Sequence, residues 1–113
     1  IDDVVKGIES ILNKAPSLKR SKKIKNDSLS PVAPFRILNI GNTNKVYLLD
    51  FINTLEKELK TKAIKNYMPM QKGDVVMTLS DTSLLKKLTG YNPKTNYKTG
   101  IRKFLKWYLN YYN

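Results

Sequence analysis

The chain has 113 residues, a formal net charge of +12, no cysteine and no histidine. These counts exclude disulfide frameworks, thiol nucleophiles, the usual zinc ligand sets and histidine-based acid–base catalysis. The length predicts one domain, residues 1–113, that can bury a modest core without disulfides or metal. No segment reaches the roughly 18 apolar residues of a membrane span, so we expect a soluble, cytoplasmic protein with no membrane partner.

The first predicted helix begins at the N-terminus, where Asp2 or Asp3 can cap it, and Pro16 ends it. Its apolar face consists of Val4, Val5, Ile8, Ile11 and Leu12. Residues 16–34 follow and contain a basic run from Lys19 to Lys25. Because a block of like charges repels itself and disfavours compaction, we interpret residues 16–34 as an exposed basic loop.

Residues 35–68 are typical of a strand–helix–strand unit. Phe35 to Ile40 reads as a strand that ends at Gly41-Asn42, and Ala63 to Met68 reads as a second strand. Thr43 or Asn44 would cap the helix between them. Its inward face would hold Leu48, Phe51 or Ile52, Leu55 and Leu59, and its outward face Asn53, Glu56, Lys57 and Lys60. This order implies a short parallel pair of strands with the helix packed on it.

Two further helices complete the prediction. Asp81 would cap the third, which Gly90 closes in a left-handed conformation, and Thr95 or Asn96 would start the last. The last helix carries an aromatic stripe, which fits either a core or interface face or a base-stacking platform. The predicted fold class is therefore α/β, a small domain of about four helices with a short two-stranded, parallel sheet.

The candidate binding site lies between Tyr67 and Val75, where Pro69 and Gly73 turn the chain out of an apolar segment. This layout exposes Gln71, Lys72 and Asp74. An amide and an ammonium can hold phosphate oxygens, and a carboxylate can accept hydrogen bonds from two sugar hydroxyls. Arg36 could also reach an anion, although a surface cation beside a strand is the commoner case, and Gly73-Asp74 could be only a turn.

No other chemistry is visible in the sequence. The five glycines are scattered singly, so there is no dinucleotide fingerprint and no phosphate-binding loop. We find no catalytic pair, no metal ligand set and no cofactor-binding motif. Asp2-Asp3 is explained most simply by the helix dipole.

Five segments, taken together and in order, resemble the C-terminal part of UDP-glucuronate 4-epimerases, which are extended short-chain dehydrogenase/reductase enzymes. They are residues 35–42 (FRILNIGN), 48–52 (LLDFI), 68–75 (MPMQKGDV), 90–95 (GYNPKT) and 100–108 (GIRKFLKWY). The resemblance spans nearly the whole chain except the basic loop. It implies the substrate-binding lobe of a two-lobe enzyme, whose N-terminal NAD-binding Rossmann lobe carries the catalytic tyrosine–lysine pair and is missing from this sequence.

The same resemblance implies a UDP-sugar as ligand, NAD as cofactor of the full-length enzyme but not of this chain, and a homodimer of the full enzyme as one option. Asp74 resembles the aspartate that binds the ribose hydroxyls in related epimerases. Gln71 takes the position of an arginine near the diphosphate, and Lys72 stands where proline is common. Without its N-terminal lobe, the chain is expected to be inactive.

Three alternatives remain open at this stage. The lobe could belong to a related nucleotide-sugar decarboxylase or dehydratase, because the groups that decide the chemistry lie elsewhere. The basic loop and the tyrosine-rich last helix could form a nucleic-acid-binding module, although nucleic acid is the less favoured partner because only three arginines are present. The chain could also be an interaction domain with no ligand of its own.

Overall fold

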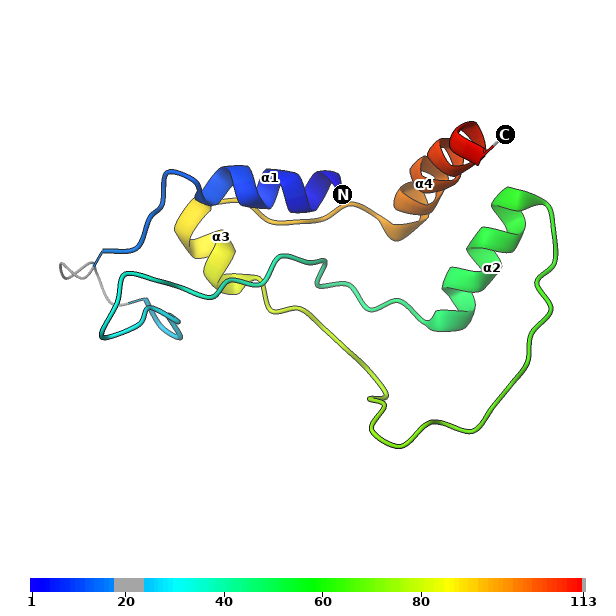
Figure 1. The fold of residues 1–113 in the computed structure, drawn as a ribbon, viewed down its shortest axis with the longest axis horizontal. Coiled ribbons are helices and arrows are strands. Elements are labelled where there is room, and N and C mark those ends of the chain that lie inside the picture. Colours follow the sequence, from blue (N-terminus) through cyan, green and yellow to red (C-terminus); the bar gives the residue numbers. More distant parts are fainter. Residues whose placement is uncertain (18–23, 113) are drawn as a thin grey trace. The chain divides into compact units, whose positions relative to one another are not determined.

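The structure, a computed structural model, describes residues 1–17 and 24–112, and the regular secondary structure in these ranges is entirely helical (Figure 1). It consists of α1 (Asp2–Ile11), α2 (Leu48–Leu59), α3 (Ser83–Thr89) and α4 (Tyr97–Tyr112). The chain divides into two compact units. The first unit contains residues 1–43 and 79–94, and the second contains residues 44–78 and 95–113.

The first unit is built on the packing of α1 against α3. Leu85 of α3 is only 1% exposed, and Pro93 is also fully buried. The segment before Gly41 lies against α1, since a Cβ atom added to Gly7 would come within 2.9 Å of Ile40 Cγ2. A glycine at position 7 therefore lets the backbone of α1 approach the Ile40 side chain closely.

A side-chain hydrogen bond joins the two ends of this unit. The Tyr91 hydroxyl donates to the backbone oxygen and to Oδ1 of Asp3, both at 3.2 Å. Burial and the neighbouring Asp3 carboxylate both raise the pKa of Tyr91. The hydroxyl therefore stays protonated and remains a hydrogen-bond donor at neutral pH.

The second unit is built on the packing of α2 against α4. Ile101 and Leu105, one helical turn apart on α4, are 4% and 7% exposed. On the same helix, the Arg102 guanidinium pairs with the Glu58 carboxylate of α2 at 2.8 Å. Because both of these charged groups are partly solvated, the ion pair contributes little stability, and the apolar contacts hold the two helices together.

The predicted α/β class is wrong, because neither residues 35–40 nor residues 63–68 form a strand in the described parts of the chain. The two segments belong to different units. In each segment the backbone bonds to a side chain instead of to a second strand. The N–H and the carbonyl of Ile37 both bond to the Ser28 hydroxyl, and the Ala63 N–H donates to the Glu56 carboxylate. Short apolar runs do not reveal their partner, and an isolated pair of strands gains little stability.

The four predicted helices are confirmed, but several predicted caps are wrong. Asp2 and Asp3 lie inside the first turn of α1, where their charges suit the helix dipole. Residue Tyr47 precedes α2 without a side-chain cap, so Thr43 and Asn44 come too early to cap it. Two further helix starts do use a nearby side chain, since Asp81 Oδ1 accepts from Ser83 N and Asn96 Oδ1 accepts from Lys98 N, each at 2.9 Å.

Gly90 closes α3 in the left-handed conformation, as predicted, with φ at +76°. We expect Gly90→Ala to lower the free energy of unfolding by about 1 kcal/mol, because a Cβ atom is strained at this φ. A steric clash with neighbouring residues does not contribute to this loss, since no atom lies within 4 Å of the added Cβ. Thermal or denaturant unfolding of the variant measures this effect.

Gly100→Ala provides a control of opposite sign. Gly100 lies inside α4, and an added Cβ would also meet open space there. Alanine should therefore stabilise the helix by about 0.5–1 kcal/mol. If both substitutions changed stability in the same direction, the left-handed conformation would not be the reason for the cost at Gly90.

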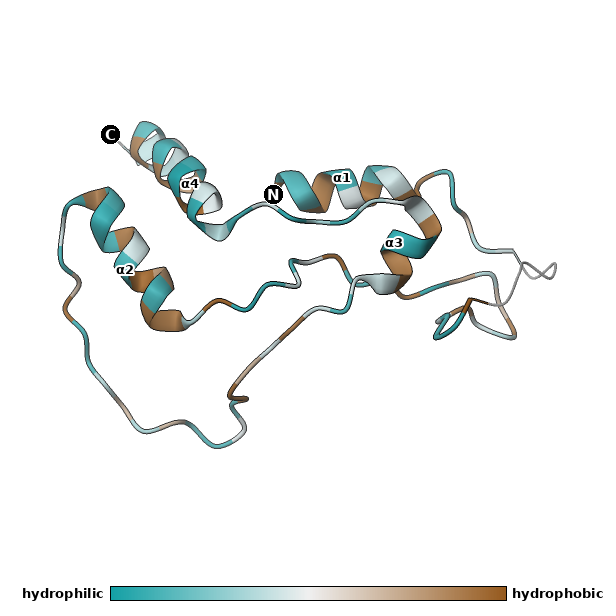
Figure 2. Ribbon diagram, turned by 180° about the vertical axis from the view of Figure 1, so that it is seen from behind, coloured by the Kyte–Doolittle hydropathy of each residue, from teal (hydrophilic) through white to brown (hydrophobic). Residues whose placement is uncertain are grey.

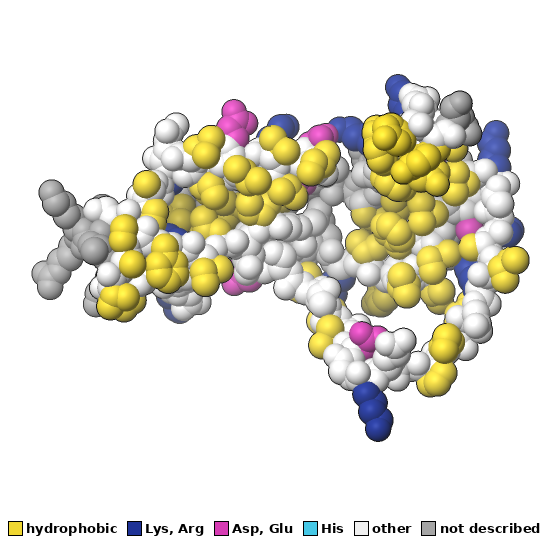
Figure 3. All heavy atoms as spheres, viewed as in Figure 1, with side chains coloured by type: hydrophobic (Ala, Val, Ile, Leu, Met, Phe, Trp, Pro, Cys, Tyr) yellow, Lys and Arg dark blue, Asp and Glu magenta, His cyan; other side chains and the backbone are white. Residues whose placement is uncertain are grey.

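Large hydrophobic side chains remain exposed in both units. Hydrophobic and hydrophilic residues alternate around α1 and α2 (Figure 2), and hydrophobic side chains gather on the surface over α1 and over α4 (Figure 3). The exposed aromatic residues of α4 are Phe104, Trp107, Tyr108, Tyr111 and Tyr112. Such a surface is typical of a face that another part of a protein covers.

Candidate functional site

The predicted binding residues Gln71, Lys72 and Asp74 lie in one exposed turn of the second unit, which we call the ligand turn (residues 71–74). The Asp74 N–H donates to the Gln71 carbonyl at 3.2 Å, and Gly73 has φ at +95°. The positive φ explains the glycine. All four residues of the turn are exposed, which leaves their side chains accessible to a ligand.

The base of the loop that carries this turn is held by Glu56 of α2. Its side chain is 5% exposed, and its carboxylate accepts from the Ala63 N–H at 2.9 Å, from Lys62 Nζ at 3.3 Å and from Lys65 Nζ. The backbone oxygen of Glu56 also accepts from Thr61 N at 3.2 Å. Glu56 therefore accepts hydrogen bonds from four residues that follow the helix, residues 61, 62, 63 and 65.

These hydrogen bonds hold the pKa of Glu56 well below its usual range, at about 2, with the Lys65 ammonium as the largest cause and the Ala63 amide next. Partial burial of the carboxylate acts in the opposite direction. Glu56 is therefore ionised at neutral pH and can act as a fixed acceptor for its donors. It is not poised to transfer protons there.

The prediction that Glu56 faces outward on α2 is wrong, since the residue is 6% exposed. Helical periodicity assigned it to the polar face because glutamate is usually solvated. The side chain is covered by residues that come after the helix, when the chain turns back along it. The feature of the sequence that comes nearest to predicting this burial is the pair of lysines at positions 62 and 65, which both donate to the Glu56 carboxylate.

The returning segment and α2 together enclose an apolar groove of about 530 Å³. The groove has an aliphatic wall from the helix and a mixed wall from the returning chain. It is lined by Leu48, Leu49, Ile52, Leu55, Glu56, Leu59 and residues 61–67. Residues 71–74 do not line it, so the ligand turn lies outside the groove.

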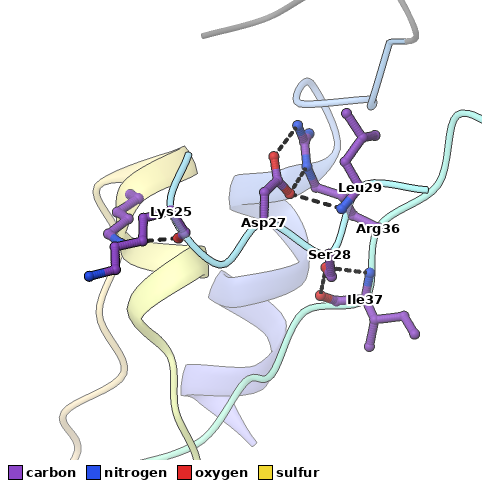
Figure 4. Close-up of polar contacts among 7 residues, drawn as sticks. Lys25, Asp27, Ser28, Leu29, Arg36 and Ile37 are labelled. Carbon is purple, nitrogen blue, oxygen red and sulfur yellow. Dashed lines mark hydrogen bonds and ion pairs between the residues drawn. The ribbon is translucent and has the colours of Figure 1, made fainter. Parts of the chain in front are cut away.

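Arg36, the fourth predicted binding residue, lies in the first unit and is paired with a carboxylate (Figure 4). Its Nε and Nη2 donate to Asp27 Oδ1 and Oδ2 at 2.8 Å and 3.0 Å, and the Arg36 side chain is only 8% exposed. The Arg36 guanidinium holds the pKa of Asp27 below its usual range. Both oxygens of Asp27 are used in this two-point contact, which suits the fork of a guanidinium.

The remaining predictions concern metals, membranes and nucleic acid. The described residues contain no group of three or more side chains that could hold a metal ion, and none of the described helices is long and apolar enough to span a membrane. Most of the basic run from Lys19 to Lys25 lies outside the described residues. Neighbouring rings on α4 do contact one another, with Trp107 stacked on Tyr111 at a centroid distance of 5.6 Å.

The described residues do not fit NAD. A dinucleotide site needs a glycine-rich turn between a strand and a helix, so that backbone N–H groups can approach the pyrophosphate. Gly73 and Gly90 are the glycines with positive φ, and they lie in separate turns of different units. No strand precedes a helix within the described ranges.

No protein-family model matches the chain, but curated proteins do. UDP-glucuronate 4-epimerase 4 of Arabidopsis thaliana is 40% identical over 114 residues, which is 100% of this chain and 25% of that protein. A probable UDP-glucuronate 4-epimerase of Rhizobium meliloti is 38% identical over 96% of this chain and 32% of its own length. Protein CapI of Staphylococcus aureus is 35% identical over 99% of this chain and 34% of its own length. The chain thus spans about a quarter to a third of the length of these relatives.

Proposed function

We propose that this chain, which belongs to the UDP-glucuronate 4-epimerase family and matches a C-terminal part of its relatives, is the nucleotide-sugar-binding lobe of a UDP-sugar 4-epimerase. The observation that carries this proposal is the match of 35–40% identity along the whole chain. A match of this length includes both the ligand turn and the helices that surround it in sequence. The ligand is a UDP-sugar, and UDP-glucuronate is the first candidate.

The geometry of the ligand turn supports the proposal. Gln71, Lys72 and Asp74 are exposed on one short turn, and the positive φ of Gly73 gives that turn its sharp bend. In the proposed complex, the Asp74 carboxylate accepts hydrogen bonds from the ribose hydroxyls. Gln71 and Lys72 donate to diphosphate oxygens.

The chemical step belongs, in this proposal, to a region that this chain does not contain. The relatives are three to four times as long as the chain, and an N-terminal NAD-binding lobe would account for most of that difference. NAD would be held there, together with the catalytic tyrosine–lysine pair. This chain would bind and orient the nucleotide half of the substrate, and it would be inactive alone.

Asp74→Ala tests the proposal directly. The chain joined to its N-terminal lobe is titrated with UDP and with UDP-glucuronate by calorimetry. We expect the substitution to weaken both ligands roughly tenfold to a hundredfold, because a charge-assisted hydrogen bond is worth about 1.5–3 kcal/mol. The loss should be similar for the two ligands, since the proposed contact is with the ribose that they share.

Asp50→Ala is the matched control. Asp50 is another exposed carboxylate of the second unit, in the first turn of α2. Its removal should leave the affinity for UDP unchanged. An Asp74→Ala protein that bound UDP as tightly as the unaltered protein would remove Asp74 from the site, and an unaltered protein that did not bind UDP would overturn the proposed function.

A further inference from the structure

Glu56 is the point at which the chain leaving α2 is fixed. The helix ends at Leu59, its C-cap residue Lys60 is left-handed with φ at +55°, and the chain then reverses along the helix. Three donors from residues 62, 63 and 65 converge on the Glu56 carboxylate. Within the described part of the segment from 66 to 78, the one backbone hydrogen bond between loop residues is the turn bond from Asp74 to Gln71. The fixed part of the loop therefore ends close to Lys65.

The distance along the chain from this anchor to the ligand turn is short. Gln71 follows Lys65 by six residues, whereas it follows Lys60, the C-cap residue of α2, by eleven. A tether of six residues confines the turn to a smaller volume than a tether of eleven, because the volume that a flexible chain searches grows with its length. With residues 62–65 fixed, the turn therefore searches a smaller volume than it would on a tether that began at Lys60.

We propose that Glu56 is a positioning residue for the ligand turn: by fixing residues 62–65 against α2, it raises the local concentration of Gln71, Lys72 and Asp74 at the nucleotide. This inference rests on the proposed function of the turn. Glu56 does not touch the ligand in this arrangement. Its carboxylate acts through the Ala63 amide and the ammonium groups of Lys62 and Lys65.

Glu56→Gln tests the anchor itself in the 113-residue chain. Glutamine has the same size but no charge, so both ammonium contacts weaken and the loop base opens more often. Trypsin, which cleaves after lysine and arginine, should cut after Lys62 and Lys65 at least tenfold faster than in the unaltered chain. Cleavage after Lys106 of α4 should keep its rate, because the opening is local.

Glu58→Gln is the matched control for this experiment. Glu58 is on the same helix and is also paired with a cation at 2.8 Å, but that cation is Arg102 of α4 and not a lysine of the returning segment. Its substitution should leave cleavage after Lys62 and Lys65 unchanged. Equal cleavage of the Glu56→Gln and unaltered chains, or faster cleavage at every site, would overturn the anchoring role.

The effect on the ligand is measured in the chain joined to its N-terminal lobe. Complete release of residues 61–65 would lengthen the free tether from six to eleven residues, so Glu56→Gln should weaken UDP binding by up to about two- to threefold, from the −3/2 power dependence of effective concentration on length. In an Asp74→Ala background, the same Glu56→Gln change should alter the affinity much less, because the turn has lost its main contact. A purely structural role would instead give equal losses in the two backgrounds, which would overturn positioning.

These outcomes separate the two proposals. If the unaltered protein does not bind UDP, the proposed function fails, whether or not trypsin detects the anchor. If UDP binds and Asp74→Ala weakens it while Glu56→Gln changes neither cleavage nor affinity, the proposed function stands and the positioning role of Glu56 fails.

Discussion

Replacing Leu85 by alanine is expected to lower the free energy of unfolding of the first unit by about 3 kcal/mol. Leu85 is 1% exposed and lies on α3, which has only seven residues and forms the unit through its packing against α1. So short a helix is not stable by itself and depends on tertiary contacts. Alanine would remove buried methyl groups and leave a cavity, for which leucine-to-alanine changes typically cost about 2–5 kcal/mol.

Denaturant unfolding followed by circular dichroism measures this loss. Leu12→Ala is the matched control, because Leu12 follows α1 in the same unit but is 70% exposed. Its substitution should change the free energy of unfolding by less than about 0.5 kcal/mol. Equal losses for the two variants would mean that Leu85 is not the centre of this unit's core.

The sequence predicted the helices because their signals are local. The apolar face of α1, the Gly90 stop after α3 and the start of α4 just after Asn96 all depend on residues within one or two turns of each other. The predicted sheet depended on a pairing between distant segments. A run such as residues 35–40 contains no information about which element will lie beside it, and here its backbone contacts the Ser28 side chain instead.

The same distinction applies to the candidate site. The turn at Gly73 could be predicted from local chemistry, since glycine before aspartate is a common turn signal, and the structure places Gln71 and Asp74 at its two ends. Their role in ligand binding stays a prediction. The burial of Glu56 could not be predicted from periodicity, because the donors that cover it come from six to nine residues further along the chain.

Arg36 provides the second large expected effect. Arg36→Met should lower the free energy of unfolding by about 3 kcal/mol, because it leaves the largely buried carboxylate of Asp27, whose side chain is 14% exposed, without its cation. Asp27→Asn should cost less by itself, since an asparagine oxygen can still accept from the Leu29 N–H, as Asp27 Oδ1 does at 3.0 Å. The double variant should be less destabilised than the sum of the two single variants, because no uncompensated carboxylate remains.

The pH dependence of stability tests the same ion pair. The pKa of Asp27 is lowered in the folded chain, chiefly by the hydrogen bond from Arg36, so the folded state binds the proton less readily than the unfolded state. The contribution of the pair is therefore fully present above the ordinary aspartate pKa of about 4, and it is lost as the pH falls through the lowered value. In Arg36→Met the pKa of Asp27 should return upward, and the variant should lose less stability than the unaltered chain between pH 5 and the acid limit of about pH 2. Identical acid profiles would show that Arg36 does not hold Asp27 ionised. In that case the guanidinium would be available to bind an anion, as the sequence first suggested.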